Sequence, residues 1–415
     1  MELKYQLFLE ALGAYFKSEK VNWDFEISMD LWKELFALAE VHKVHPLIFE
    51  AVYDCPAIEK MDKAFLDAMK RRGISIMMHQ VQKTAKFLKL YQYLQEKDLR
   101  PIVVKGIVCR QLYQNPDLRV SADEDLWVEA HEFANCVEVL QAYGLKATNL
   151  NGALDEADEI GFLGENNLTY IELHKHLFAG DSAAYGSLND YFSECFEEKI
   201  AVNIQGTTVY TMKPQQHLFY LICHALKHFL HSGFGIRQVC DIASFANAYG
   251  GEIDWLKLLQ QCREIQGEKF AAAVFKISKK HLNFDENKAC YPKEWQEIEI
   301  DEEDLLLDLL CSGIYGGATM SRKHSSNMTL EAVAAQRRGK KSSSGLTASL
   351  FPSVKRLEGQ YVYLKKQPYL LPVAWGERAI KYCFETVKEE ENNAIDAVKI
   401  GNQRVRLLKK YGILD

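Results

Sequence analysis

The sequence predicts an α+β protein, in which a small mixed β-sheet with helices is flanked by helical N- and C-terminal regions. Three observations lead to this prediction. Apolar residues recur every three or four positions from residue 1 to about 98, as in amphipathic helices. The same helical spacing returns after Pro214. Between these regions, across residues 99–212, short β-branched runs alternate with helical segments, which is typical of a mixed α/β unit.

Residues 1–98 are expected to form a helical N-terminal region. Leu7, Leu12 and Phe16 lie on one helical stripe near the start of the chain. The stretch 62–97 contains neither glycine nor proline after Gly73 and keeps a spacing of three and four between its apolar residues. A single long helix is therefore predicted over most of that stretch.

Residues 99–212 are predicted to form the α/β core. A first strand over residues 101–104 is stopped by Lys105-Gly106 and followed by a helical segment. Residues 122–128 and 168–174 are further candidate strands. Residues 201–212 resemble a hairpin that turns at Gln205-Gly206.

The remaining chain is divided into three predicted regions. Residues 213–335 form a helical domain, 336–349 a flexible basic loop, and 350–415 a C-terminal helical region. The loop is basic, rich in serine and low in apolar residues. A solvated loop is the default interpretation of such a charge run, and contact with RNA or a phosphorylated acceptor is the alternative.

Composition restricts the class of function. The chain is 48% hydrophobic and 26% charged, with a net charge of −7, so no overall basic surface for nucleic acid is expected and DNA is not a predicted partner. The 10 cysteines form no CxxC pair, which argues against a zinc site and a disulfide framework. No signal peptide and no membrane-spanning run of about 20 apolar residues is recognised. We therefore expect a cytoplasmic protein without a membrane partner.

The chemically informative block begins at the turn after the first strand. The glycine of Lys105-Gly106 allows close approach of the backbone, and the following helix would present free N–H groups to an anion such as a triphosphate. Lys105 would add a positive charge for phosphate.

Two carboxylates follow on the next predicted strand. Asp123 and Asp125 are two residues apart, so their side chains leave the same face of a strand. Carboxylate oxygens on a rigid strand suit Mg²⁺, and Glu172 on a later predicted strand is the best third carboxylate. Taken alone, an Asp-x-Asp pair is more often a solvated turn. The order of strand, glycine turn, helix, arginine, paired aspartates and later glutamate favours metal binding here.

This block resembles a family of uncharacterised bacterial nucleotidyltransferases, distant relatives of the DNA polymerase β superfamily. The resemblance is carried by Lys105-Gly106, by the spacing of Tyr113, Pro116 and Arg119, and by Asp123-Glu-Asp125. Glu172-Leu-His174 and the helical segment 217–228 extend it. It covers most of residues 30–380 and is sharp only over 103–128.

The resemblance implies that an acceptor hydroxyl attacks the α-phosphorus of a nucleoside triphosphate and releases pyrophosphate. Asp123 and Asp125 would hold Mg²⁺ (or Mn²⁺), and Glu172 would be a third ligand or the base. ATP is the expected triphosphate. The acceptor stays open among a small molecule, RNA and protein.

The resemblance also implies a phosphate-binding set. Lys105 and the Gly106 backbone would hold the β- and γ-phosphates, and Arg119 would stabilise developing phosphate charge. Ser121 is a weaker candidate phosphate donor.

Two departures from the family pattern leave a second hypothesis open. Lys105-Gly106 stands where the superfamily has Gly-Gly or Gly-Ser, so a phosphate-binding serine is missing. Glu124 occupies a position that is normally apolar, which would fit a shifted strand, a partly exposed sheet face or a degenerate site. The alternative is therefore a catalytically inactive module that binds nucleotide or a partner for regulation.

The substrate side is expected to involve the helical C-terminal region. The candidate residues are His174, His224, Lys227, His228 and Arg237. His224 and His228, one helical turn apart, could share a metal ion, but polar residues that line a cleft are the favoured interpretation. For Arg237, an ion pair with Asp241 that joins two helices is an equal alternative.

Overall fold

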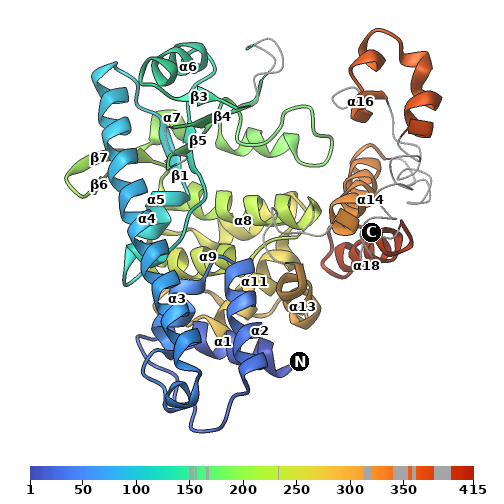
Figure 1. Ribbon diagram of the computed structural model, residues 1–415. Helices are drawn as coiled ribbons and strands as arrows, with labels where there is room; N and C mark the ends of the chain where they lie inside the picture. The colour runs from blue at the N-terminus through green and yellow to red at the C-terminus, as the bar shows by residue number, and fades with distance from the viewer. Residues whose placement is uncertain are drawn as a thin grey trace.

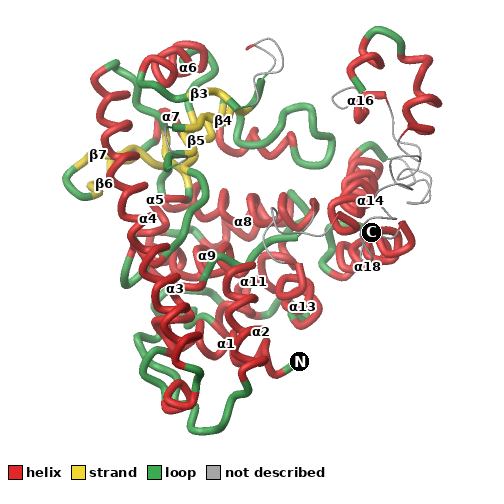
Figure 2. The backbone as a smooth tube through the Cα atoms, viewed as in Figure 1, coloured by secondary structure: helices red, strands yellow, loops and turns green. Residues whose placement is uncertain are grey.

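The fold is described by a computed structural model covering residues 1–148, 154, 157–164, 168–231, 233–312, 320–339, 354–357, 361–377 and 394–415. It is an α+β fold, as predicted. Figure 2 shows the strands gathered in one part of the molecule, with helices making up most of the rest.

The N-terminal region is helical as predicted. Its helices are α1 (Leu3–Phe16), α2 (Met29–Val41), α3 (His45–Val52) and α4 (Lys63–Glu96). The 34-residue α4 confirms the single long helix, and Asp62 caps its N-terminus by accepting a hydrogen bond from the Phe65 amide at 2.8 Å.

The described strands form a seven-stranded mixed sheet in the order β3-β4-β5-β2-β1-β7-β6. β1 is antiparallel to β2 and parallel to β7, and β2 is parallel to β5. The predicted strands near 101–104, 122–128 and 168–174 are confirmed as β1, β2 and β5. The strands are β1 (Ile102–Val104), β2 (Glu124–Trp127), β3 (Lys146–Ala147), β4 (Glu159–Leu163), β5 (Tyr170–His174), β6 (Ile200–Ile204) and β7 (Thr207–Thr211).

The predicted hairpin is confirmed by β6 and β7. Its two turn residues, Gln205 and Gly206, have φ angles of 49° and 85°. Two positive φ angles in a two-residue loop match the right-handed twist of the flanking strands, and a glycine takes the second position without strain.

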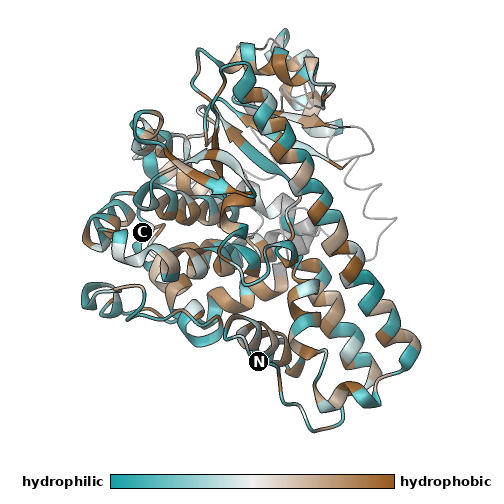
Figure 3. Cartoon of the chain, turned by 90° about the vertical axis from the view of Figure 1, so that its left-hand side faces the viewer, coloured by the Kyte–Doolittle hydropathy of each residue, from teal (hydrophilic) through white to brown (hydrophobic). Residues whose placement is uncertain are grey.

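One face of the sheet is covered by α4 and by α6 (Phe133–Ala142). Their apolar residues, such as Tyr91 and Leu140, form a core with Val103, Leu126 and Leu173 of the strands. Figure 3 shows that hydrophobic and hydrophilic positions recur by turns along the long helices, as expected of amphipathic helices. Since side chains alternate along a strand, Asp125 leaves the opposite face from Leu126.

The opposite face of the sheet lies against a layer of helices that includes α8 (Figure 1). One large core includes residues of this layer and of the N-terminal helices, among them Phe8, Trp32, Phe229 and Phe270. The helices that follow the sheet are α8 (Pro214–His231), α9 (Ile236–Tyr249), α10 (Trp255–Glu264), α11 (Glu268–His281), α12 (Lys293–Gln296) and α13 (Glu303–Ser312). Shorter helices are α5 (Gly106–Arg110) and α7 (Cys195–Glu198).

Toward the C-terminus, α14 (Met320–Arg337) packs against α18 (Ala394–Lys410) and α8. The buried Arg404 of α18 donates to the carbonyls of Phe229 and His231 at the end of α8. A short helix, α16 (Val354–Leu357), lies between α14 and α18 in the sequence. Residues 340–349 of the predicted basic loop lie outside the described residues. Among the described helices, none is both long and apolar enough to cross a membrane.

Candidate active site

A cavity of about 1330 Å³ opens between the sheet and the helices. It is lined by every site residue that the sequence predicted: Lys105, Gly106, Arg119, Ser121, Asp123, Asp125, Glu172, His174, His224, Lys227, His228 and Arg237. Its volume exceeds the roughly 300–1,000 Å³ of a pocket for one small molecule. The cavity also reaches the N-terminal helices, where it is lined by Lys43, Arg72, His79 and Lys83. The substrate side of the cavity is therefore not built from the C-terminal helical region alone.

The acidic centre lies where β2 and β5 run side by side. Asp125 is paired with Glu172 in the parallel register, so both side chains point toward α8 from neighbouring strands. The ligand atoms of Asp125, Glu172 and His174 lie within 4.8 Å of one another. Asp123 lies one residue before β2 and lines the same cavity.

The surroundings shift the pKa values of the two carboxylates, Glu172 and Asp125, in opposite directions. Burial raises the pKa of Glu172 to about 9, and the negative charges of Asp125 and Asp123 add to this effect. Burial alone would also raise the pKa of Asp125. The Lys105 ammonium, 3.0 Å from its Oδ1, and His174 instead lower the pKa of Asp125 to about 2.

The centre has the chemistry of a divalent-cation site. The second oxygen of Asp125, Oδ2, is fully buried and has no hydrogen-bond partner among the residues that the structure describes. A buried carboxylate oxygen without a partner is costly, and an ion bound between Asp125 and Glu172 would satisfy it. The residues present therefore fit the metal that the sequence predicted.

The Lys105-Gly106 turn is held from the side of α8. Lys105 has φ 48° and ψ −128°, a strained conformation for a residue with a side chain. Its amide donates to Nε2 of His217 at 3.1 Å, and the His217 ring also contacts Thr211 Oγ1 at 3.3 Å. Burial lowers the pKa of His217 to about 3, which keeps the ring neutral and able to accept.

The same turn is held from the other side of the sheet by Glu124. This residue is 3% exposed, so the interpretation of a partly exposed sheet face is wrong. Its Oε2 accepts from the Ile107 amide at 2.7 Å, and its Oε1 pairs with Arg110 at 2.6 Å. A Cβ at Gly106, where φ is +37°, would lie 2.1 Å from Glu124 Oε2. Only glycine therefore fits this position.

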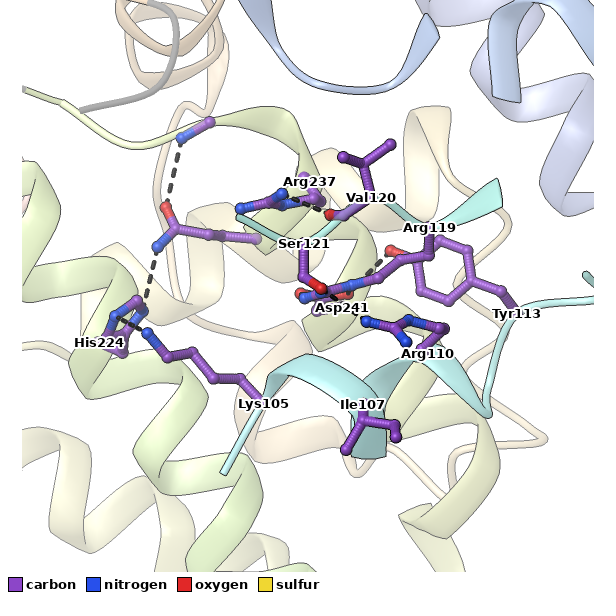
Figure 4. Close-up of polar contacts among 12 residues, drawn as sticks. Lys105, Ile107, Arg110, Tyr113, Arg119, Val120, Ser121, His224, Arg237 and Asp241 are labelled. Carbon is purple, nitrogen blue, oxygen red and sulfur yellow. Dashed lines mark hydrogen bonds and ion pairs between the residues drawn. The ribbon is translucent and has the colours of Figure 1, made fainter. Parts of the chain in front are cut away.

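These contacts change what the turn offers to an anion. Free N–H groups were expected at the start of this helix, but the amides of Lys105 and Ile107 donate to His217 and Glu124. The Lys105 ammonium lies within the cavity, 3.1 Å from Nε2 of His224 (Figure 4). The side chain of Lys105, more than the backbone of the turn, is thus the group placed to meet a phosphate.

Ser121, Arg119 and Arg237 each make hydrogen bonds or ion pairs with other residues of the protein. Ser121 Oγ donates to Glu124 at 2.8 Å and accepts from Arg110 at 2.6 Å. Asp241 forms its ion pair with Arg119, at 2.5 Å, and not with Arg237 as one alternative had it. Arg237 donates to the Val120 carbonyl at 2.5 Å (Figure 4). The phosphate roles of Arg119 and Ser121 stay predictions.

The substrate-side residues of α8 also meet in the cavity. Nε2 of His228 lies 3.2 Å from Nε2 of His224, and Nδ1 of His224 lies 3.1 Å from the Gln238 amide nitrogen. Lys227 lies over the rings of Phe178 and Tyr185. Burial lowers the pKa of His224, His228 and Lys227.

Three contributors were missed from the sequence. Glu159 on β4 lies 3.5 Å from Nδ1 of His174, and β4 was not predicted. Lys83 on α4 donates to the carbonyls of Ser121 and Ala122, both at 2.7 Å. Arg110 is fully buried. The alternation of Ile160 and Phe162 was the available signal for β4, whereas nothing in the sequence pairs Lys83 with a loop 38 residues away.

The sequence model of a family described as uncharacterised nucleotidyltransferase matches residues 28–283, which is more than half of the chain. The chain belongs to this family. The match includes α2 to α11, the whole sheet and all the site residues named above. No curated protein and no solved structure matches the chain. The nucleotidyltransferase family thus agrees with the resemblance found in the sequence.

Proposed function

We propose that this nucleotidyltransferase transfers a nucleoside monophosphate from a nucleoside triphosphate, ATP being the expected donor, to an acceptor hydroxyl and releases pyrophosphate. The observation that carries the proposal is the pairing of Asp125 with Glu172 on adjacent parallel strands, beside the Lys105 ammonium. Carboxylates can hold the metal ion of a phosphoryl-transfer site, and a lysine beside a glycine turn can bind phosphate.

Asp125 and Glu172, with Asp123 beside them, would hold Mg²⁺ or Mn²⁺. When bound, the ion supplies positive charge for the phosphate oxygens and makes the acceptor hydroxyl more acidic. The Lys105 ammonium, which lines the cavity 3.0 Å from Oδ1 of Asp125, would contact the phosphates of the triphosphate. His217 and Glu124 hold the turn by accepting hydrogen bonds from the amides of Lys105 and Ile107.

The size and lining of the cavity support two substrates. Its volume exceeds that of a one-ligand pocket, and its walls come from the sheet, α8, α9 and α4. The inactive, regulatory alternative was suggested by Glu124 and by the missing serine. Glu124 leaves the face of the sheet opposite Asp125 and is bonded to Arg110, so its presence does not favour an inactive site.

The test is transfer of label from each α-³²P nucleoside triphosphate, with Mg²⁺, to fractionated lysate. Wild type is compared with Asp125→Asn, which keeps the side-chain shape and removes the charge. Glu138→Gln is the matched control, because Glu138 is exposed on α6, against the opposite face of the sheet. We expect label transfer by wild type and by the control, and a loss of at least about 100-fold in Asp125→Asn.

Binding is measured in parallel by equilibrium dialysis of the same labelled triphosphates. Transfer that persists in Asp125→Asn would contradict the assignment of the centre. Nucleotide binding without transfer to any fraction would support the regulatory alternative. If wild type neither binds a nucleoside triphosphate nor transfers label, the proposed function is wrong.

A further inference from the structure

The ring of His174 lies between the carboxylates of the acidic centre. Its Nε2 is 2.9 Å from Oδ1 of Asp125 and 3.8 Å from Oε2 of Glu172. Glu172 and His174 are two residues apart on β5, so both side chains leave the same face of the sheet. His174 is 4% exposed, so its ring is held among these groups and does not extend into solvent.

The other nitrogen of the ring faces a third carboxylate. Glu159 is paired with His174 across the β4–β5 register, and its Oε2 lies 3.5 Å from Nδ1. Nδ1 is fully buried and makes no hydrogen bond to the described part of the chain. A small movement of the Glu159 side chain, which is 40% exposed, would supply one.

These positions match an arrangement found in metal sites. A histidine that binds an ion through one nitrogen commonly donates its other N–H to a carboxylate, which fixes the tautomer and makes the binding nitrogen more basic. With the proton on Nδ1 facing Glu159, Nε2 would present its lone pair to the space shared by Asp125 and Glu172.

We propose that His174 binds the catalytic ion through Nε2, that Glu159 orients its ring, and that the centre consequently binds Mn²⁺ in preference to Mg²⁺. Mg²⁺ strongly prefers oxygen ligands, whereas the affinity of a site with a nitrogen ligand rises along the first-row transition metals. The inference rests on the proposed function, because it concerns the ion of the same centre.

The test uses Mn²⁺ alone with the full-length protein, and the readout is the three-pulse electron spin echo modulation of the bound ion. Nitrogen directly bound to Mn²⁺ gives a ¹⁴N modulation. We expect it in wild type, and we expect it to disappear in protein labelled with ¹⁵N-histidine, which requires no substitution. It should also be absent in His174→Ala.

His176→Ala is the matched control. His176 follows His174 by two residues, pairs with Asp158 at 2.6 Å and does not line the cavity. This variant should keep the modulation. Glu159→Gln should weaken Mn²⁺ binding by about 10-fold, measured by titration, while Mg²⁺ binding, measured by competition, changes less.

The outcomes separate this inference from the proposed function. Mn²⁺ that binds wild type but not Asp125→Asn, without ¹⁴N modulation, would overturn the role of His174 and leave the carboxylate centre intact. Modulation that persists in folded His174→Ala would assign the nitrogen to another histidine and also overturn it. Mn²⁺ binding that Asp125→Asn does not weaken would contradict both proposals.

Discussion

The side chains of Arg110 and Glu124 form an ion pair without exposure to solvent beneath the Lys105-Gly106 turn. Burial would lower the pKa of Arg110, and the charge of Glu124 opposes that effect. Arg110 also donates to Thr84 on α4, and Ser121 donates to Glu124. Because each charge is buried against the other, neither can be removed alone without a large cost.

Replacing Arg110 alone is therefore expected to lower the free energy of unfolding more than replacing both Arg110 and Glu124. Arg110→Leu should lower the free energy of unfolding by about 3–5 kcal/mol, since Glu124 would keep a buried, uncompensated charge. The double variant Arg110→Leu/Glu124→Leu should recover part of that loss. The recovery is incomplete because the Ile107 amide loses its acceptor, at about 1–3 kcal/mol. Urea unfolding of the three proteins measures these differences, and a double variant that is less stable than the single one would contradict the argument.

Gly106 is constrained by φ and by space together, whereas Gly144 is constrained by φ alone. A Cβ at Gly106 would lie 2.1 Å from Glu124 Oε2, but at Gly144, where φ is +102°, it would meet nothing within 4 Å. Gly144→Ala should thus cost about 1–2 kcal/mol for its backbone conformation. Gly106→Ala should cost more and weaken nucleotide binding as well, because Glu124 must leave the turn. Equal losses of stability in thermal unfolding would show that the contact with Glu124 is unimportant.

At the scale of single residues, the sequence predicts part of the cavity lining but not the partners of those residues. Asp125, Glu172 and Lys105 could be placed because strand alternation and a glycine turn fix where side chains point. Arg110, Lys83 and Glu159 act through contacts that depend on how α4 and β4 pack, and no local periodicity encodes those contacts. Ser121 and Arg119 line the cavity, but Ser121 donates to Glu124 and Arg119 pairs with Asp241.

Among the elements, those with a strong local pattern were predicted and the weakly patterned ones were not. The long α4 and the β6–β7 hairpin follow from helical spacing and turn chemistry. The strand β3 has two residues, and β4 carries Glu159 and Gly161, so neither shows the composition of a strand. The position of β4 is set by its pairing with β5, and that of β3 by its pairing with β4.

His42 joins three helices and makes their packing sensitive to acid. It follows α2, its Nε2 contacts the Leu310 carbonyl of α13 at 3.3 Å, and its Nδ1 accepts from the Ile236 amide of α9 at 3.4 Å. The ring must be neutral to make both contacts. Burial lowers the pKa of His42 to about 4, while its pKa in the unfolded chain is about 6.5.

The sign of the pH dependence follows from these two values. Above pH 6.5 the ring is neutral in both states, and its contacts contribute fully. As the pH falls from 6.5 to about 4, the unfolded chain takes up a proton that the folded chain does not. Stability should therefore fall, by up to about 1.4 kcal/mol per pH unit from this group. Urea midpoints across this range should show a shallower slope for His42→Asn, and an unchanged slope for the exposed His131→Asn; equal slopes for wild type and His42→Asn would contradict the assignment.

The larger of the two hydrophobic cores that pack against the sheet joins the N-terminal region to the rest of the protein. Residues 1–98 share this core with the helices after the sheet. α1 and α11 approach so closely that a Cβ at Gly13 would lie 2.8 Å from the His281 carbonyl oxygen. The ring of Phe16 packs at 5.5 Å from that of Tyr113, and Asn283 donates to the Phe16 carbonyl. On the other side, α4 contributes Phe87, Leu88, Leu90, Tyr91 and Leu94 to the core that covers the sheet.

This shared core predicts that the region 1–98, expected from the sequence as a separate helical region, does not fold alone. A fragment of residues 1–98 would expose the apolar faces of α1, α3 and α4 that the rest of the chain buries, and should show weak, non-cooperative helicity. A fragment of residues 99–415 should likewise lose cooperative unfolding, because the sheet would lack α4. The two fragments produced together should restore a single cooperative transition, measured by circular dichroism in urea. A cooperative transition in the 1–98 fragment alone would show that the division near residue 98 is a true domain boundary, and that the cavity lies between two independently folded parts.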